Sequence, residues 1–183
     1  MKGLPSLKGT TGLPGLDGKR ATESKPPLPD PKVADSLLLY DEKQSDLTRL
    51  VGSARLARKV MALQKQYPNG TVPELLVMDW LDEQGQEYVY QAPLGGGRTI
   101  KGGLVADFLI PSALGWSCWF IQGDYWHTQV GTTEKNTADK TIALTQEYAG
   151  RQITEALELW ENKLYKQRDL VCSMALAGIE LGR

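Results

Sequence analysis

The stretch GLVADFLIP at residues 103–111, followed closely by WSCWFIQGDYWH at residues 116–127, decides the fold. Each begins with an apolar run of strand length, and such runs bounded by glycine or proline are typical of buried strands. A weakly alternating run at residues 87–91 precedes them, and a longer run at 151–160 follows. The sequence therefore predicts a small sheet that begins with a hairpin or meander.

A helix with two capping signals precedes these strands. Thr71 can accept a free backbone N–H, Pro73 suits the first turn, and Glu74 stands three residues after Thr71, which is the spacing of a capping box. Gly85 is placed to end this helix. Periodicity predicts further helices at 45–66, 134–148 and 162–181. Ser45 would cap the start of the first of these helices, and Gly182 would end the last. The order of helices and strands predicts an α/β fold with a mixed sheet and one crossover.

The chain of 183 residues suits one domain, over 45–183, preceded by an arm. Residues 1–44 are rich in proline and glycine, which predicts an extended or disordered arm. Residues 1–65 hold 12 Lys and Arg against 7 Asp and Glu, whereas residues 66–183 hold 9 against 15, so the net charge of −1 hides a basic part and an acidic body. The basic face of helix 45–66 is either solvated or in contact with phosphates through Arg55, Arg58 and Lys59.

Composition also excludes several classes of protein. Two cysteines and one histidine cannot build a Cys/His zinc cage or a disulfide framework. The sequence contains no apolar run of about 18 residues, which argues against a membrane-spanning helix, and it lacks a signal-peptide pattern. We expect a cytoplasmic protein with no membrane partner, in a bacterial, phage or nucleoid context.

The glycine-rich segment GGGRTIKGG at residues 95–103 does not have the spacing of a P-loop or of a dinucleotide fingerprint. It predicts a hairpin-like connection. Its Arg98 and Lys101 either contact a nucleic-acid backbone or are ordinary loop cations.

Asp107 interrupts an apolar run, and a carboxylate among buried strand residues costs free energy unless it is paired or binds a metal ion. Two neighbouring strands would bring Asp107 and Gln122 to one end of the sheet, where Glu74 could add a third oxygen ligand. Such an oxygen-rich site suits Mg²⁺. Each residue also has a structural interpretation: Asp107 as a hydrogen-bonded acid, Gln122 as a strand-end residue and Glu74 as a helix cap.

This arrangement resembles the PD-(D/E)XK nuclease superfamily, a restriction-endonuclease-like fold with an αβββαβ core. The segment FIQGDYWH at 120–127 is similar to the very-short-patch repair endonuclease branch, in which an apolar strand runs into Gly-x-aromatic-Trp-His, and LELWE at 157–161 is similar to its final core strand. The resemblance implies that Asp107 and Glu74 bind metal and that His127 transfers a proton near the scissile phosphate. Gln122 stands where the wider superfamily usually has Asp or Glu, and Asp124 where it usually has Lys.

Two functional hypotheses follow from the sequence. The first is a DNA endonuclease that uses Mg²⁺ or Mn²⁺ held by Asp107, Glu74 and Gln122, with His127 as the proton-transfer group. The second is a nuclease fold without catalysis that serves as a structural or assembly component and docks on a protein partner through its N-terminal arm. A third possibility, a DNA-binding module without catalysis, predicts affinity that falls steeply with salt.

Overall fold

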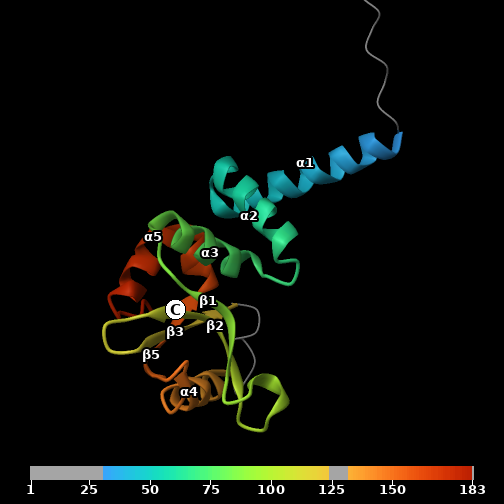
Figure 1. Ribbon diagram of the computed structural model, residues 1–183. Helices are drawn as coiled ribbons and strands as arrows, with labels where there is room; N and C mark the ends of the chain where they lie inside the picture. The colour runs from blue at the N-terminus through green and yellow to red at the C-terminus, as the bar shows by residue number, and fades with distance from the viewer. Residues whose placement is uncertain (1–30, 124–131, 183) are drawn as a thin grey trace, which may run out of the picture.

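The structure is a computed structural model that describes residues 31–123 and 132–182. Within these ranges, a mixed sheet is covered by helices on both faces, and α1 and α2 lie farther from it (Figure 1). The elements are α1 (Pro31–Val51), α2 (Ala54–Gln66), α3 (Val72–Gln84), β1 (Val89–Leu94), the 3₁₀ turn η1 (Gly97–Thr99), β2 (Leu104–Pro111), β3 (Trp116–Gln122), α4 (Thr132–Ala143), β4 (Glu147–Tyr148), β5 (Arg151–Trp160) and α5 (Glu161–Leu176).

The capping signals before α3 are confirmed. The Thr71 hydroxyl accepts the Glu74 N–H at 3.5 Å, and Glu74 Oε2 accepts the Thr71 N–H at 2.9 Å. Gly85 ends the helix in the left-handed region, with φ of 63°. This capping box satisfies two backbone donors that the first turn leaves unpaired.

The predicted single helix 45–66 is wrong, because the chain breaks at Gly52, whose φ is 70°. Ser53 then caps α2 by accepting the Leu56 N–H, so Ser45 lies inside α1 and caps nothing. The predicted extended arm also ended too late, since α1 begins at Pro31 and residues 31–44 are helical. Proline at the first position of a helix loses no internal hydrogen bond, which is why a proline-rich composition misplaced this boundary. Residues 1–30 lie outside the described part.

Two further boundaries differ from the prediction. Helix α4 ends at Ala143 instead of residue 148, because β4 pairs with the start of β5 through a tight turn in which Ala149 and Gly150 both have positive φ. Helix α5 ends at Leu176, and Gly178 in the left-handed region follows it, so Gly182 is not its cap.

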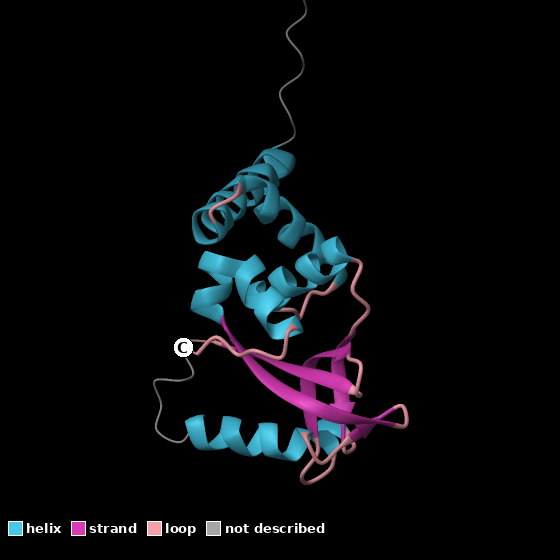
Figure 2. Cartoon of the chain, turned by 90° about the vertical axis from the view of Figure 1, so that its left-hand side faces the viewer, coloured by secondary structure: helices cyan, strands magenta, loops and turns pink. Residues whose placement is uncertain are grey.

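The sheet has the order β1-β2-β3-β5-β4. Strands β1, β2 and β3 form an antiparallel meander, and β5 pairs parallel with β3 after the crossover through α4. Figure 2 shows α4 on one face of the sheet and α3 with α5 on the other. The predicted mixed α/β class and the leading meander are therefore confirmed.

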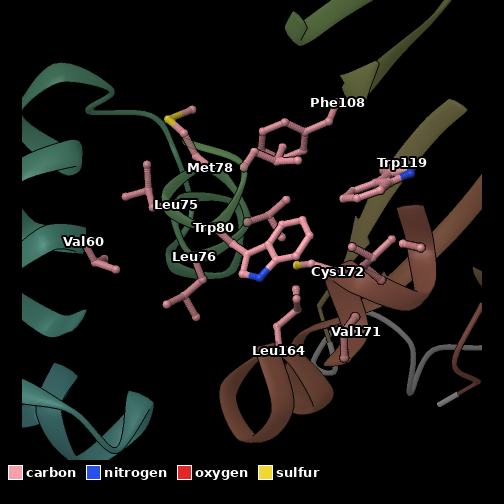
Figure 3. Close-up of a cluster of buried hydrophobic side chains, with 14 of the residues drawn as sticks. Val60, Leu75, Leu76, Met78, Trp80, Phe108, Trp119, Leu164, Val171 and Cys172 are labelled. Atoms are coloured by element: carbon pink, nitrogen blue, oxygen red, sulfur yellow. The ribbon is translucent and has the colours of Figure 1, made fainter. Parts of the chain in front are cut away.

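Two apolar clusters hold the layers together. The larger one lies between the sheet and helices α3 and α5 and continues to α1 and α2, and Figure 3 shows Trp80 between the strand residues Phe108 and Trp119 and Leu164 of α5. The smaller one lies between the other sheet face and α4 and contains Ala106, Cys118, Phe120, Ala143 and Ile153. Burial raises the pKa of the Cys118 thiol, as expected of a core residue that is not a nucleophile.

Candidate functional site

The site is centred on an irregularity where β1 and β2 pair. The ladder joins Tyr90 to Phe108 and Ala92 to Ala106, but Gln91, which would face Asp107 between these pairs, has φ of 49°. A non-glycine residue in this region is strained, and such strain concentrates at functional sites. Ala106 and Phe108, two residues apart, would normally point to the same face of the sheet. Here Ala106 belongs to the cluster on the α4 side and Phe108 to the cluster on the α3 side.

The ladder between β2 and β3 ends at the same place. The last paired residues toward this end are Phe108 and Trp119. Beyond them, Asp107 Oδ2 accepts the backbone N–H of Ile121 at 2.7 Å, so a side chain replaces the strand carbonyl that would otherwise accept it. The expectation that Asp107 needs a partner in an apolar strand is thereby met, and the bond engages one of its two carboxylate oxygens.

Asp107 and Gln122 share a cleft of about 380 Å³ at this end of the sheet. Arg98, from the loop that connects β1 to β2, also lines it. The α4 side of the cleft contributes polar residues that the sequence did not single out. The described residues that line the cleft are Arg98, Gly103, Leu104, Val105, Asp107, Phe120, Ile121, Gln122, Lys135, Asn136 and Asp139.

The α4 residues could have been found from the topology. A crossover helix covers the sheet face it spans, so its residues at i, i+1 and i+4 face the strand ends. Lys135, Asn136 and Asp139 have this spacing. The missing information was the residue at which α4 begins, because that decides which polar residues turn toward the cleft.

Glu74 is near Asp107 but does not line the cleft with it. Its side chain is 9% exposed, and Oε2 accepts the Tyr90 hydroxyl at 2.8 Å in addition to the Thr71 N–H. Its negative charge still acts on Asp107 and opposes ionisation there. The sequence-based helix-cap interpretation of Glu74 is therefore correct.

The environment raises the pKa of Asp107 to about 7. Burial is the largest cause, because it disfavours the charged form, and the Glu74 charge acts in the same direction. The Ile121 N–H and the Arg98 charge act in the opposite direction and do not offset them. A cation next to Asp107 would favour its ionised form.

Across residues 31–123 and 132–182, no cluster of three or more His, Cys, Asp or Glu side chains is placed to hold a metal ion. The predicted ligand oxygens that line the cleft are those of the Asp107 carboxylate and the Gln122 amide, and the other carboxylate of the cleft, Asp139, is paired with Lys135. This small donor set fits Mg²⁺, which keeps several of its waters and often takes only one or two protein carboxylates besides substrate phosphates.

The basic residues predicted to contact nucleic acid separate into three groups. Arg98 lies at the cleft, and Lys101 is exposed in the same loop without lining it. Arg55 and Arg58 are exposed on α2, and neither lines this cleft. Lys59 contacts acidic residues of α3 instead of pointing freely into solvent.

Two acids of α3, Asp79 and Glu83, form a cluster of ion pairs with Lys59 and Arg168. Lys59 Nζ lies 3.0 Å from Asp79 and 2.6 Å from Glu83. Arg168 of α5 binds the same two carboxylates at 2.6 and 2.8 Å. Because Asp79 is buried, these ion pairs connect α2, α3 and α5. This structural role explains the basic residue at position 59 without a contact to nucleic acid.

The predicted residues Asp124 and His127 lie outside the described residues. In the parts that are described, no helix is long and apolar enough to cross a membrane. Comparisons with protein-family models, with curated proteins and with solved structures found no match. The fold thus defines a mixed α/β protein, and its function has to be argued from the site.

Proposed function

We propose that this protein is a metal-dependent DNA endonuclease with a restriction-endonuclease-like core. The observation that carries the proposal is Asp107, an acid set into an apolar strand at the point where both ladders are interrupted, in a cleft with Gln122 and Arg98. Apart from the short turn η1 and the two-residue strand β4, the element order from α3 to β5 agrees with the αβββαβ order that the resemblance implies. Together they support phosphodiester hydrolysis in this cleft.

The residues would divide the work as follows. Asp107 and Gln122 offer oxygens to Mg²⁺ or Mn²⁺, and the buried Glu74 adds negative charge nearby that favours a cation. A bound divalent cation supplies charge neutralisation of the phosphate and a more acidic water. Arg98 holds a phosphate oxygen through its guanidinium. By the resemblance, His127 would pass the proton between water and the departing oxygen, because an imidazole titrates near neutral pH.

One observation favours the alternative of a nuclease fold without catalysis that acts as an assembly component. Glu74, which the resemblance makes a metal ligand, is engaged by the Thr71 N–H and the Tyr90 hydroxyl. In this alternative, Glu74 only caps α3 and does not bind a metal ion. Residues 1–44, including the start of α1, would provide the docking element.

The test is cleavage of supercoiled plasmid DNA by the full chain with Mg²⁺ or Mn²⁺, compared with the same protein in the presence of a chelator. Asp107→Asn keeps an acceptor for the Ile121 N–H but removes the charge, so it should lower the cleavage rate by about 1000-fold while the fold persists. Asp46→Asn is the matched control and should cleave like the wild type, since Asp46 is exposed on α1, where it pairs with Arg49.

The outcomes separate the functions. Metal-dependent cleavage that Asp107→Asn abolishes supports the endonuclease. No cleavage together with no Mg²⁺ or Mn²⁺ binding by calorimetry overturns it and supports the assembly component. DNA affinity that falls steeply with salt, without cleavage, identifies a DNA-binding module.

A further inference from the structure

The cleft around Asp107 has a second cation that the sequence did not assign. Lys135 lines it from α4, whereas Arg98 lines it from the loop between β1 and β2. Two separate elements therefore each bring one positive side chain to the cleft that holds Asp107. Both side chains are exposed, so a ligand entering from solvent can reach them.

The ion pair of Lys135 is weak enough to be exchanged for a ligand. Its Nζ lies 3.5 Å from Asp139 one turn away, and the lysine side chain is 74% exposed. Exposed pairs of this kind contribute little to stability. By contrast, Lys140, one turn and a half further along α4, lies 2.6 Å from Glu180 and is 29% exposed. Of these two α4 lysines, Lys135 is therefore the one available to a substrate.

The cleft is lined by two cations, Arg98 and Lys135, and two acids, Asp107 and Asp139, so a divalent cation held by Asp107 would leave it suited to an anionic, oxygen-rich ligand. The two cations and the Gln122 amide can bind phosphate oxygens. The cleft volume of about 380 Å³ is within the range of small-ligand sites and admits a phosphate with part of its neighbouring sugars.

We propose that Lys135 contacts a non-bridging oxygen of the scissile phosphodiester and is the catalytic cation on the α4 side of the cleft. The assignment rests on the proposed function. In hydrolysis a bond forms between a water oxygen and phosphorus, and the bond from phosphorus to one bridging oxygen breaks. Of the two protons of this water, one ends on the departing oxygen and the other is released to solvent, while Lys135 stays protonated and stabilises the extra negative charge on the phosphate.

The experiment compares Lys135→Met and Lys135→Arg with the wild type, using the full chain, supercoiled plasmid DNA and Mg²⁺. Loss of one charge-stabilising donor should lower the cleavage rate at saturating enzyme by about 100-fold in Lys135→Met, and Lys135→Arg should recover most of that loss. Lys166→Met is the matched control, because Lys166 is an exposed lysine on α5 that lines a different cleft.

A second measurement detects the contact without chemistry. Binding of a fluorescent DNA duplex is measured in the presence of a chelator at several salt concentrations. The slope of log affinity against log salt concentration should be shallower by about one in Lys135→Met and unchanged in Lys135→Arg. A residue with only a structural role would change the melting temperature instead, and here the melting temperature should stay within about 2 °C because the ion pair of Lys135 is exposed.

Failure of this assignment differs from failure of the proposed function. If the wild type cleaves DNA and Lys135→Met cleaves at the same rate with the same salt dependence, the role of Lys135 is overturned and the endonuclease stands. If the wild type does not cleave DNA, the endonuclease fails and the role of Lys135 fails with it. A loss in Lys135→Met that Lys135→Arg does not recover also overturns the assignment.

Discussion

Asp107→Asn should make the protein more stable at alkaline pH and change little at acidic pH. The asparagine keeps an oxygen that can accept the Ile121 N–H, so the strand connection seen at 2.7 Å persists. What the substitution removes is a negative charge that the surroundings disfavour. In the wild type, burial and the Glu74 charge raise the pKa of Asp107 from 3.8 to about 7.

The sign and the size of the change in unfolding free energy follow from proton linkage. Because the folded pKa is the higher one, the folded state holds a proton between about pH 4 and pH 7 that the unfolded chain has released, and stability is lost as pH rises through this window. Above pH 7 the full difference applies, and a rise from 3.8 to about 7 corresponds to about 4 kcal/mol. Solvent reaches the half-buried side chain, so we expect a gain of at least about 2 kcal/mol for Asp107→Asn at pH 8.

The assay is urea unfolding of wild type and Asp107→Asn at pH 5 and pH 8, with a chelator present so that no divalent cation neutralises the carboxylate. The gain from Asp107→Asn should be about a third as large at pH 5 as at pH 8, because pH 5 lies about a third of the way from the unfolded pKa of 3.8 to the folded pKa of about 7. Asp46→Asn is the control and should have a small effect at both pH values, since its carboxylate is exposed. An equal difference at both pH values, or a less stable Asp107→Asn at pH 8, would refute the reasoning.

Three further substitutions test the packing around the site. Tyr90→Phe removes the hydroxyl that donates to buried Glu74 and should cost about 1.5–3 kcal/mol in urea unfolding, with no change in the denaturant slope. Asp79→Ala leaves the two cations of its cluster with one buried partner fewer and should cost about 3–5 kcal/mol; a cost below about 1 kcal/mol would contradict a structural role. Trp119→Ala opens a cavity at a fully buried position and should cost about 3–5 kcal/mol in thermal unfolding.

Local signals in the sequence were sufficient for the elements whose ends are marked chemically. The capping box at Thr71 and the apolar run WSCWFIQ set α3 and β3 correctly, because each depends on interactions between near neighbours. The break at Gly52 was missed because the periodic apolar pattern continues across it, although Gly52 in the left-handed region and the Ser53 cap are themselves local signals. The end of α4 depends on β4 pairing with β5, which is also a contact outside the helix.

At the site, the sequence identified the residue that breaks a pattern and missed the residues that follow one. Asp107 stood out because an acid in an apolar strand is costly. Lys135 and Asp139 look like ordinary charges of a polar helix, and only the crossover over the sheet turns them toward the cleft. Glu74 carried two interpretations, and the Tyr90 hydroxyl that helps to decide between them comes from β1, a contact that spacing along the chain does not reveal.

The presence of an acid at position 107 is itself an argument about function. A neutral acceptor such as asparagine would satisfy the Ile121 N–H equally well and would avoid ionising a group whose pKa the fold raises to about 7. An acid that lowers stability near neutral pH is expected where a positively charged partner is bound during function, because that partner restores the favourable balance. Arg98 supplies part of this compensation and does not bring the pKa back to its usual range. Divalent cations should therefore stabilise the wild type against unfolding more at pH 8 than at pH 5 and should leave Asp107→Asn unaffected, whereas a purely structural acid predicts no stabilisation by these cations in either protein.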